Sequence, residues 1–194
     1  MFTGEMNTRI GILKHDVCNW VKIKSVWGKC NEKNSRCVYS QNGVSSLKTM
    51  TVTTYKDNEV TETNLLQIAN KKYLPVAIIP NKNSIYCDII CAQVSVKEML
   101  TYETKDIIDE NRCVTKANTQ KKIQEVIFAN KYVNMGVNAV YNTENRAFII
   151  IIPKEIRIDA GSIVKIDDVF YYVTICLEYG EYFNEYQIEV KEDV

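Results

Sequence analysis

Residues 162–177 read SIVKIDDVFYYVTICL, and this stretch decides the fold class more than any other. Ser162–Ile166 and Val169–Leu177 are rich in β-branched and aromatic residues, which are enriched in strands. The two residues between these runs, Asp167 and Asp168, are more typical of a tight turn than of a pair of metal ligands. The stretch therefore predicts a β-hairpin with a two-residue turn.

Strand signals continue on both sides of this hairpin. Phe148–Ile152 is a continuous apolar run closed by Pro153, which predicts a strand buried on both faces. Residues 185–190, EYQIEV, alternate between polar and apolar side chains, as in a half-buried strand. Earlier strands are expected at Val21–Trp27, Ser46–Tyr55, Leu74–Ile79 and Ile85–Val94.

Helices are expected only in the middle of the chain. Ser95–Glu98 has the S-x-x-E form of a capping box, and apolar residues recur near helical spacing as far as about Ile108. Asn118 suits the cap of a second helix, whose apolar stripe includes Val126 and Ile127 and which ends near residues 134–136. Residues 63–70 are expected to form one or two further helical turns.

These signals predict a mainly β (α+β) fold, a β-barrel or β-sandwich with one or two short inserted helices. We expect a single domain over residues 1–194, with a barrel core built from residues 18–56 and 146–191. The middle segment, residues 57–145, is then a mixed segment and a candidate insertion into that core.

Composition excludes several classes of protein. The chain has 194 residues, 46% apolar and 25% charged, which suits a globular fold and excludes disorder as the main state. The formal net charge is zero, whereas a protein dedicated to coating DNA is normally basic.

The charge is nevertheless unevenly distributed. Residues 1–56 carry +6, residues 57–153 carry 0 and residues 154–194 carry −6. Two interpretations remain open at this point. Either the basic face of one copy meets the acidic face of the next, which generates rings or filaments, or the two ends of the chain pair within one subunit as neighbouring strands.

The cysteines indicate free thiols in a reducing compartment. There are seven, an odd number at irregular spacing, and no apolar signal segment precedes them. Their spacing does not match a structural zinc site, so we expect no metal and no cofactor. A disulfide between Cys30 and Cys37 is compatible with a turn between them. The longest apolar stretch, residues 147–153, is too short to span a membrane as a helix.

Catalytic signals are few. The chain has one histidine, His15, and no phosphate-binding loop, dinucleotide fingerprint or nucleophile elbow. We therefore expect no enzymatic activity. One alternative is a small enzyme with Cys18 or Cys176 as nucleophile. Another is a nucleic-acid-binding β-barrel, in which lysines near Trp20 and Trp27 and the tyrosines near the C-terminus form a platform for single strands.

Several segments resemble phage proteins. Residues 9–15, RIGILKH, are similar to the short basic start of phage head–tail joining proteins. Residues 26–29, 43–44 and 49–52 (VWGK, GV and TMTV) resemble the N-terminal half of small minor capsid or neck proteins from long-tailed phages of Gram-positive bacteria. Residues 158–165 and 171–173 resemble their closing barrel strands. The resemblance covers about half of the chain and leaves residues 56–146 without a counterpart.

This resemblance implies a phage head–tail connector, a structural virion protein that forms a ring in the neck or collar between the capsid portal and the tail. Its partners would be other copies of itself and portal, adaptor and tail proteins, with DNA at most passing through the lumen and no membrane. Its location would be the virion, after synthesis in the bacterial cytoplasm. The residues expected at the interface are Lys14, Lys22, Lys24, Lys29, Glu178, Glu181, Glu185, Tyr179 and Tyr182.

Overall fold

The computed structural model is almost entirely β-sheet. It describes residues 6–35, 37–38, 45–46, 48–81, 85–108, 114–130, 147–179 and 183–191. The strands are β1 (Thr8–Asp16), β2 (Asn19–Lys33), β3 (Cys37–Val38), β4 (Ser45–Ser46), β5 (Thr49–Tyr55), β6 (Leu65–Ile68), β7 (Lys71–Pro80), β8 (Tyr86–Ile108), β9 (Val114–Asn130), β10 (Ala147–Pro153), β11 (Ile163–Ile166), β12 (Val169–Tyr179) and β13 (Phe183–Val190). The expectation of a mainly β fold is confirmed.

One antiparallel sheet closes on itself twice. Its strand order is β11-β12-β13-β10-β9-β8-β5-β2-β1-β6-β7, and two further pairings, β8 with β7 and β8 with β11, join its ends to its middle. One ring thus contains β8, β5, β2, β1, β6 and β7, and we call it the N barrel. The other contains β8, β9, β10, β13, β12 and β11, and we call it the C barrel. Separately, β3 and β4 pair as a small ribbon.

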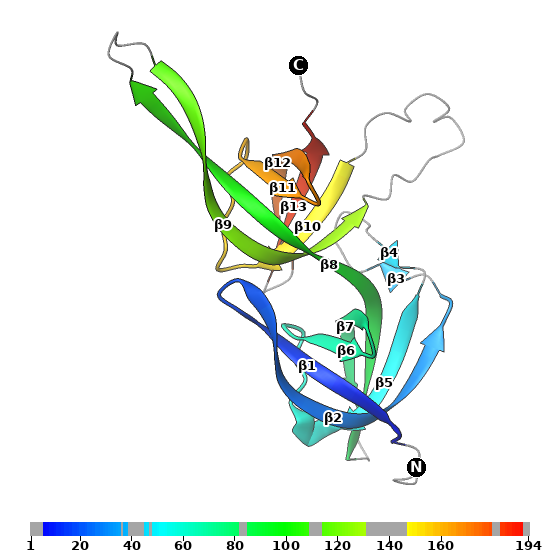
Figure 1. Cartoon of the computed structure of the whole chain (residues 1–194). Helices are drawn as coiled ribbons and strands as arrows, with labels where there is room; N and C mark the ends of the chain where they lie inside the picture. Colours follow the sequence, from blue (N-terminus) through cyan, green and yellow to red (C-terminus); the bar gives the residue numbers. More distant parts are fainter. Residues whose placement is uncertain are drawn as a thin grey trace, which may run out of the picture.

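Strand β8 belongs to both barrels. Its residues 86–92 pair with β5 in the N barrel, whereas residues 95–108 pair with β9 in the C barrel. Figure 1 shows β8 running out of the lower, N barrel and along the upper, C barrel. Strand β8 therefore connects the two barrels directly, because one continuous strand contributes to both rings of the sheet.

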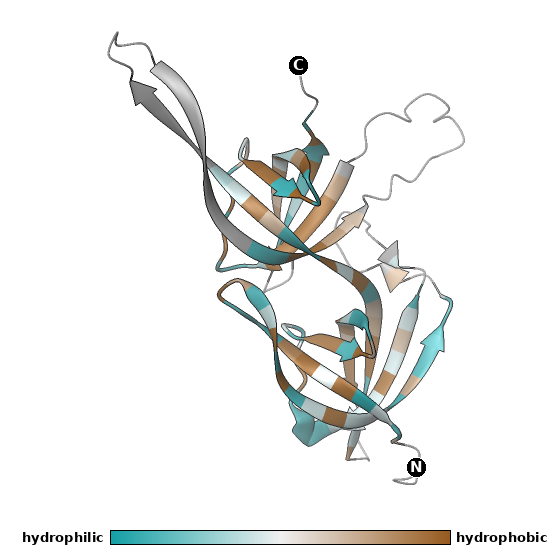
Figure 2. Cartoon of the chain, in the orientation of Figure 1, coloured by the Kyte–Doolittle hydropathy of each residue, from teal (hydrophilic) through white to brown (hydrophobic). Residues whose placement is uncertain are grey.

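Each barrel has its own apolar interior, because alternate side chains of a strand point to opposite faces. The N-barrel interior includes Ile12, Val52 and Ile89, all essentially inaccessible to solvent. The C-barrel interior includes Ile150 and Ile188. Figure 2 shows the corresponding alternation of hydrophobic and hydrophilic residues along strands of both barrels.

A third apolar cluster joins the barrels, and we call it the junction core. It combines N-barrel residues such as Leu13 and Leu74 with C-barrel residues such as Ile127 and Ile149. Strand β10 therefore faces the C-barrel interior with one side and the junction core with the other. The predicted burial of Phe148–Ile152 on both faces is confirmed over Ile149–Ile152.

The predicted hairpin at Asp167-Asp168 is also confirmed. Ile166 pairs with Val169, which leaves these two aspartates as the turn. Both adopt positive φ, 47° and 66°, as a two-residue turn that matches the strand twist requires.

Both predicted helices are wrong, and the described residues contain no α-helix. Residues 95–108 continue β8, and residues 118–130 belong to β9. Fourteen residue pairs join the two strands, from Ser95 with Phe128 to Ile108 with Val114. This long-range pairing satisfies the backbone along the whole segment and overrides the local capping signal. The helical turns expected over residues 63–70 are replaced by strand β6.

The strand pairings also correct the predicted barrel core. Residues 18–56 and 146–191 do not form one core, because their strands belong to different barrels. Residues 57–145 are not an insertion, since they supply β6, β7, β8 and β9, without which neither ring closes.

Candidate interaction surfaces

The four predicted lysines gather on the β1–β2 hairpin of the N barrel. Lys14 lies on β1, and Lys22, Lys24 and Lys29 lie on β2. Apolar side chains are exposed beside them on β2: Val21, Ile23 and Trp27, the last two with 55% and 57% of their surface accessible. We call residues 21–27 the β2 surface. Exposed apolar side chains that lie close together can mark a surface that meets another protein.

The β2 surface also has an unpaired backbone edge. β1 pairs with one edge of β2 along residues 19–28, whereas β5 pairs with the other edge only at Lys29–Lys33. Trp20 N–H donates to the Glu125 carboxylate at 2.6 Å, and Trp27 C=O accepts from the Thr54 hydroxyl at 3.2 Å. Between these two contacts, residues 21–26 pair with no strand of the described chain on that edge.

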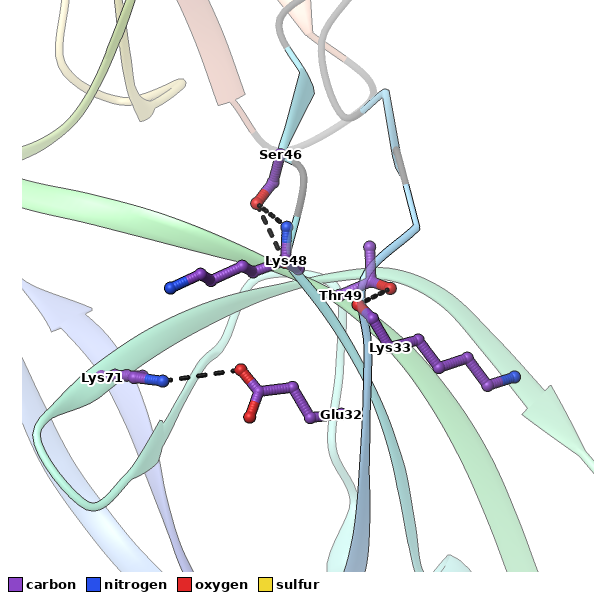
Figure 3. Close-up of polar contacts among 6 residues, drawn as sticks. All are labelled: Glu32, Lys33, Ser46, Lys48, Thr49 and Lys71. Carbon is purple, nitrogen blue, oxygen red and sulfur yellow. Dashed lines mark hydrogen bonds and ion pairs between the residues drawn. The ribbon is translucent and has the colours of Figure 1, made fainter.

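The rim of the N barrel adds further positive charge. Figure 3 shows Lys33 and Lys48 extending away from the backbone contacts that surround them. The Thr49 hydroxyl donates to Lys33 C=O at 3.1 Å, and the Ser46 hydroxyl donates to Lys48 C=O at 2.9 Å. The first bond links β5 to β2, and the second links Ser46 of β4 to the residue just before β5. Neither bond involves the ammonium group of Lys33 or Lys48.

The predicted acidic group is not assembled as expected. Glu178 is exposed on β12 and forms an ion pair with Lys154 at 3.2 Å. Glu185 is 0% exposed, so it does not contribute to an accessible surface. Glu185 stands between Ile151 of β10 and Leu177 of β12, in the middle of the sheet. Glu181, Tyr182 and the side chain of Tyr179 lie outside the described residues.

An aromatic strip on the C barrel contains Tyr172, one of the tyrosines expected to form a platform, together with Tyr102 and Phe170, which were not predicted. The rings of Tyr102 and Phe170 lie 5.7 Å apart, and Tyr172 is exposed two residues further along β12. The Lys165 ammonium lies 5.6 Å from the centre of the Phe170 ring, and that of Lys191 lies 5.6 Å from that of Tyr172. Only the sheet brings these residues together. In the sequence, the i, i+2 spacing of Phe170 and Tyr172 is the feature that indicates two aromatic side chains on the same face of a strand.

The two barrels divide the charge of the chain. Residues 1–94, which run to the end of the N-barrel part of β8, carry +5, and residues 95–194 carry −5. The N-terminal strands pair with β5, β6 and one another, and none of the described strands within residues 1–56 pairs with one within residues 154–194. The interpretation of the two ends as neighbouring strands is therefore wrong.

A pocket of about 390 Å³ lies between the loop after β10 and strands β12 and β13, and Cys176 and Tyr186 line it. The Tyr186 hydroxyl accepts a hydrogen bond from Ile158 N–H at 3.1 Å, and Asn184 Nδ2 donates to Lys154 C=O at 3.4 Å. Burial is the main cause that raises the pKa of Tyr186. These polar groups hold the loop after β10 against the barrel, which is a structural role.

The two cysteines named as candidate nucleophiles differ in exposure: Cys176 is exposed and Cys18 is partly buried, whereas Cys87 and Cys91 are buried. The six described cysteines are free, so Cys30 and Cys37 do not form a disulfide, and Cys113 lies outside the described residues. Burial raises the pKa of the thiols of Cys91 and Cys87. A raised pKa lowers the fraction of reactive thiolate. The His15 ring packs edge-on against Trp20 at 5.1 Å.

Among the described residues, no group of three or more histidine, cysteine, aspartate or glutamate side chains is arranged to hold a metal ion. No helix in the described part of the chain is long and apolar enough to cross a membrane. A scan against family models, a search of curated proteins and a search of solved structures each gave no match.

Proposed function

We propose that this protein is a non-enzymatic structural component that assembles head to tail with copies of itself. The observation that carries this proposal is the division of charge between the barrels, +5 over residues 1–94 and −5 over residues 95–194. Two oppositely charged ends on one elongated subunit favour contact between unlike surfaces. Such heterologous contacts build rings when the rotation closes and filaments when it does not.

Exposed apolar side chains on both barrels support the same proposal. The N barrel exposes Ile23 and Trp27, and the C barrel exposes Phe170, Tyr172 and Ile175. Charge complementarity mainly sets partner choice and register, whereas buried aromatic and aliphatic side chains supply most of the binding energy. Each barrel carries both kinds of group.

Several short segments resemble phage neck proteins: residues 9–15, 26–29, 43–44, 49–52, 158–165 and 171–173. Together with this resemblance, the charge and the exposed apolar side chains favour a ring in a virion neck or collar. Its neighbours there are portal, adaptor and tail proteins. A neck ring needs stiff subunits, and two barrels that share one strand and a common junction core are stiff. The proposal requires no active site, cofactor or metal.

The aromatic strip with Lys165 and Lys191 is the feature that best suits a nucleic-acid platform. This strip lies, however, within residues 95–194, which carry a net charge of −5, and that charge repels the phosphate groups of a nucleic acid. A salt-dependent gel shift on single-stranded DNA would favour that alternative over the assembly proposal.

Light scattering after size-exclusion chromatography tests self-assembly. We expect a discrete oligomer under reducing conditions at about 50 mM salt, and smaller species at about 1 M salt, where charge contacts are screened within about 3 Å. A strictly monomeric protein at both salt concentrations contradicts the proposal. The genes beside this one test the neck assignment: portal, terminase or tail genes support it.

A further inference from the structure

A two-stranded ribbon extends beyond the C barrel. β8 and β9 pair as far as Ile108 with Val114, but β11 pairs with β8 only between Met99 and Tyr102. β10 pairs with β9 only at residues 127–130. Residues 103–108 and 114–119 therefore form six residue pairs with no third strand beside them in the described chain. We call this segment the arm, and Figure 1 shows it projecting from the C barrel.

The arm has the properties of an element that needs a partner. An isolated two-stranded ribbon is marginally stable in water. Both of its outer edges present backbone N–H and C=O groups that no other described strand satisfies, and such edges are templates for strand addition. The arm continues β8 away from the N barrel (Figure 1), so its own N barrel is not the partner that covers it.

The β2 surface has the matching properties. Its free edge spans residues 21–26, six residues, and the arm offers six residue pairs. The exposed side chains of Ile23 and Trp27 lie on the same stretch of β2. An added strand there would satisfy the unpaired backbone edge and cover apolar surface at the same time.

Charge favours the same pairing. Of the two strands of the arm, residues 103–108, ETKDII, carry a net charge of −1 and end in two isoleucines, whereas residues 114–119, VTKANT, carry +1. The β2 surface contributes Lys22 and Lys24, in the half of the chain that carries +5. Residues 103–108, with a net charge of −1 and two isoleucines, are therefore the strand of the arm that suits this edge in charge and hydropathy.

We propose that the arm of one copy adds as a strand to the free edge of β2, residues 21–26, in a second copy. This inference rests on the proposed head-to-tail assembly and names its contact. Each copy gives one arm and receives one arm. The contact is consequently heterologous, and it leaves an unused arm at one end and an unused edge at the other until a ring closes.

Two complementary variants test the contact. In the first, residues 104–118 are replaced by Asn-Gly, which joins Glu103 to Thr119 through a two-residue hairpin turn and removes the arm. In the second, Ile23→Glu and Trp27→Glu place charges on the β2 surface. The matched control is Ile79→Glu with Ile85→Glu, which changes two exposed isoleucines of the N barrel (50% and 63% exposed) and adds the same charge.

We expect each test variant alone to be monomeric, with association weakened by about tenfold or more because buried charge and lost anchors oppose binding. The control should assemble like the wild type. An equimolar mixture of the two test variants should form a one-to-one dimer and nothing larger, since only one intact arm and one intact edge remain. Circular dichroism spectra and urea unfolding midpoints check that every variant is folded.

The outcomes separate the two proposals. If the armless protein assembles like the wild type, or if the mixed variants stay monomeric, the arm contact is wrong while head-to-tail assembly stands. If the wild type is itself monomeric, both are wrong. Hydrogen exchange gives a second readout: backbone amides of residues 21–26 should be slower to exchange in the oligomer than in the armless variant.

Discussion

Gly28 on β2 stands where three strands approach too closely for a side chain. A Cβ added to Gly28 would lie 2.5 Å from Ile10 Cδ1 and 2.9 Å from the backbone oxygen of Thr53. Ile10 is buried in the N-barrel interior, so its methyl group has little room to move away. Thr53 is paired in the sheet with Lys29, so its carbonyl is also held in place.

Gly28→Ala should therefore destabilise the protein. Overpacking of a core costs about 1–3 kcal/mol, and replacing a strand glycine regains about 0.5–1 kcal/mol of backbone entropy. The net loss expected in the free energy of unfolding is about 1 kcal/mol, and at most about 2.5 kcal/mol. Urea unfolding followed by tryptophan fluorescence measures it well, because both tryptophans of the chain, Trp20 and Trp27, lie on β2.

Gly11→Ala is the matched control on the neighbouring strand. Its closest contact would be 3.2 Å to Lys22 Cε, the end of a flexible side chain that can shift. We expect Gly11→Ala to range from neutral to about 1 kcal/mol more stable, because the same gain in backbone entropy meets only a side chain that can shift. Adding Ile10→Val to Gly28→Ala removes the 2.5 Å contact and should recover part of the loss. Equal stability of Gly28→Ala and Gly11→Ala would refute the packing argument.

Two further predictions concern the junction and the C barrel. Glu125→Ala should lower the free energy of unfolding by about 1–2 kcal/mol, because the partly exposed carboxylate accepts a 2.6 Å hydrogen bond from Trp20 N–H; urea unfolding measures this. The hydrogen bond from Lys165 at 2.7 Å lowers the pKa of Asp168 below 3.8. Lys165→Met should therefore raise this pKa back toward 3.8, and an NMR titration of the Asp168 carboxyl group measures the change.

Each of these two predictions, for Glu125→Ala and for Lys165→Met, has its own control. Glu98 is exposed directly opposite Glu125 on β8, so Glu98→Ala should change stability by less than about 0.5 kcal/mol. The lowered pKa of Asp168 means that its contribution to stability is fully present above pH 3.8 and is lost as the pH falls through the lowered value. An unchanged Asp168 titration in Lys165→Met would contradict the assigned cause.

Patterns that depend on neighbouring residues were predictable. The turn at Asp167-Asp168 and the strands around it follow from local chemistry, because a two-residue turn and alternating side chains need no distant partner to be recognised. The same holds for the buried run Phe148–Ile152. The lysines of residues 14–29 lie on one hairpin because β1 and β2 are adjacent in sequence, although no strand was predicted over Thr8–Asp16.

Sequence alone determined that this chain is rich in strands and that its charge is polarised from one end to the other. Only the tertiary structure shows which strands close each barrel. It also places Ser95–Glu98, which has the pattern of a helix cap, within the long strand β8. It also decided that Glu185 is buried despite its place in an alternating pattern. The reason is physical: alternation assigns a side chain to one face of a strand, but only the elements packed against that face determine whether water reaches it.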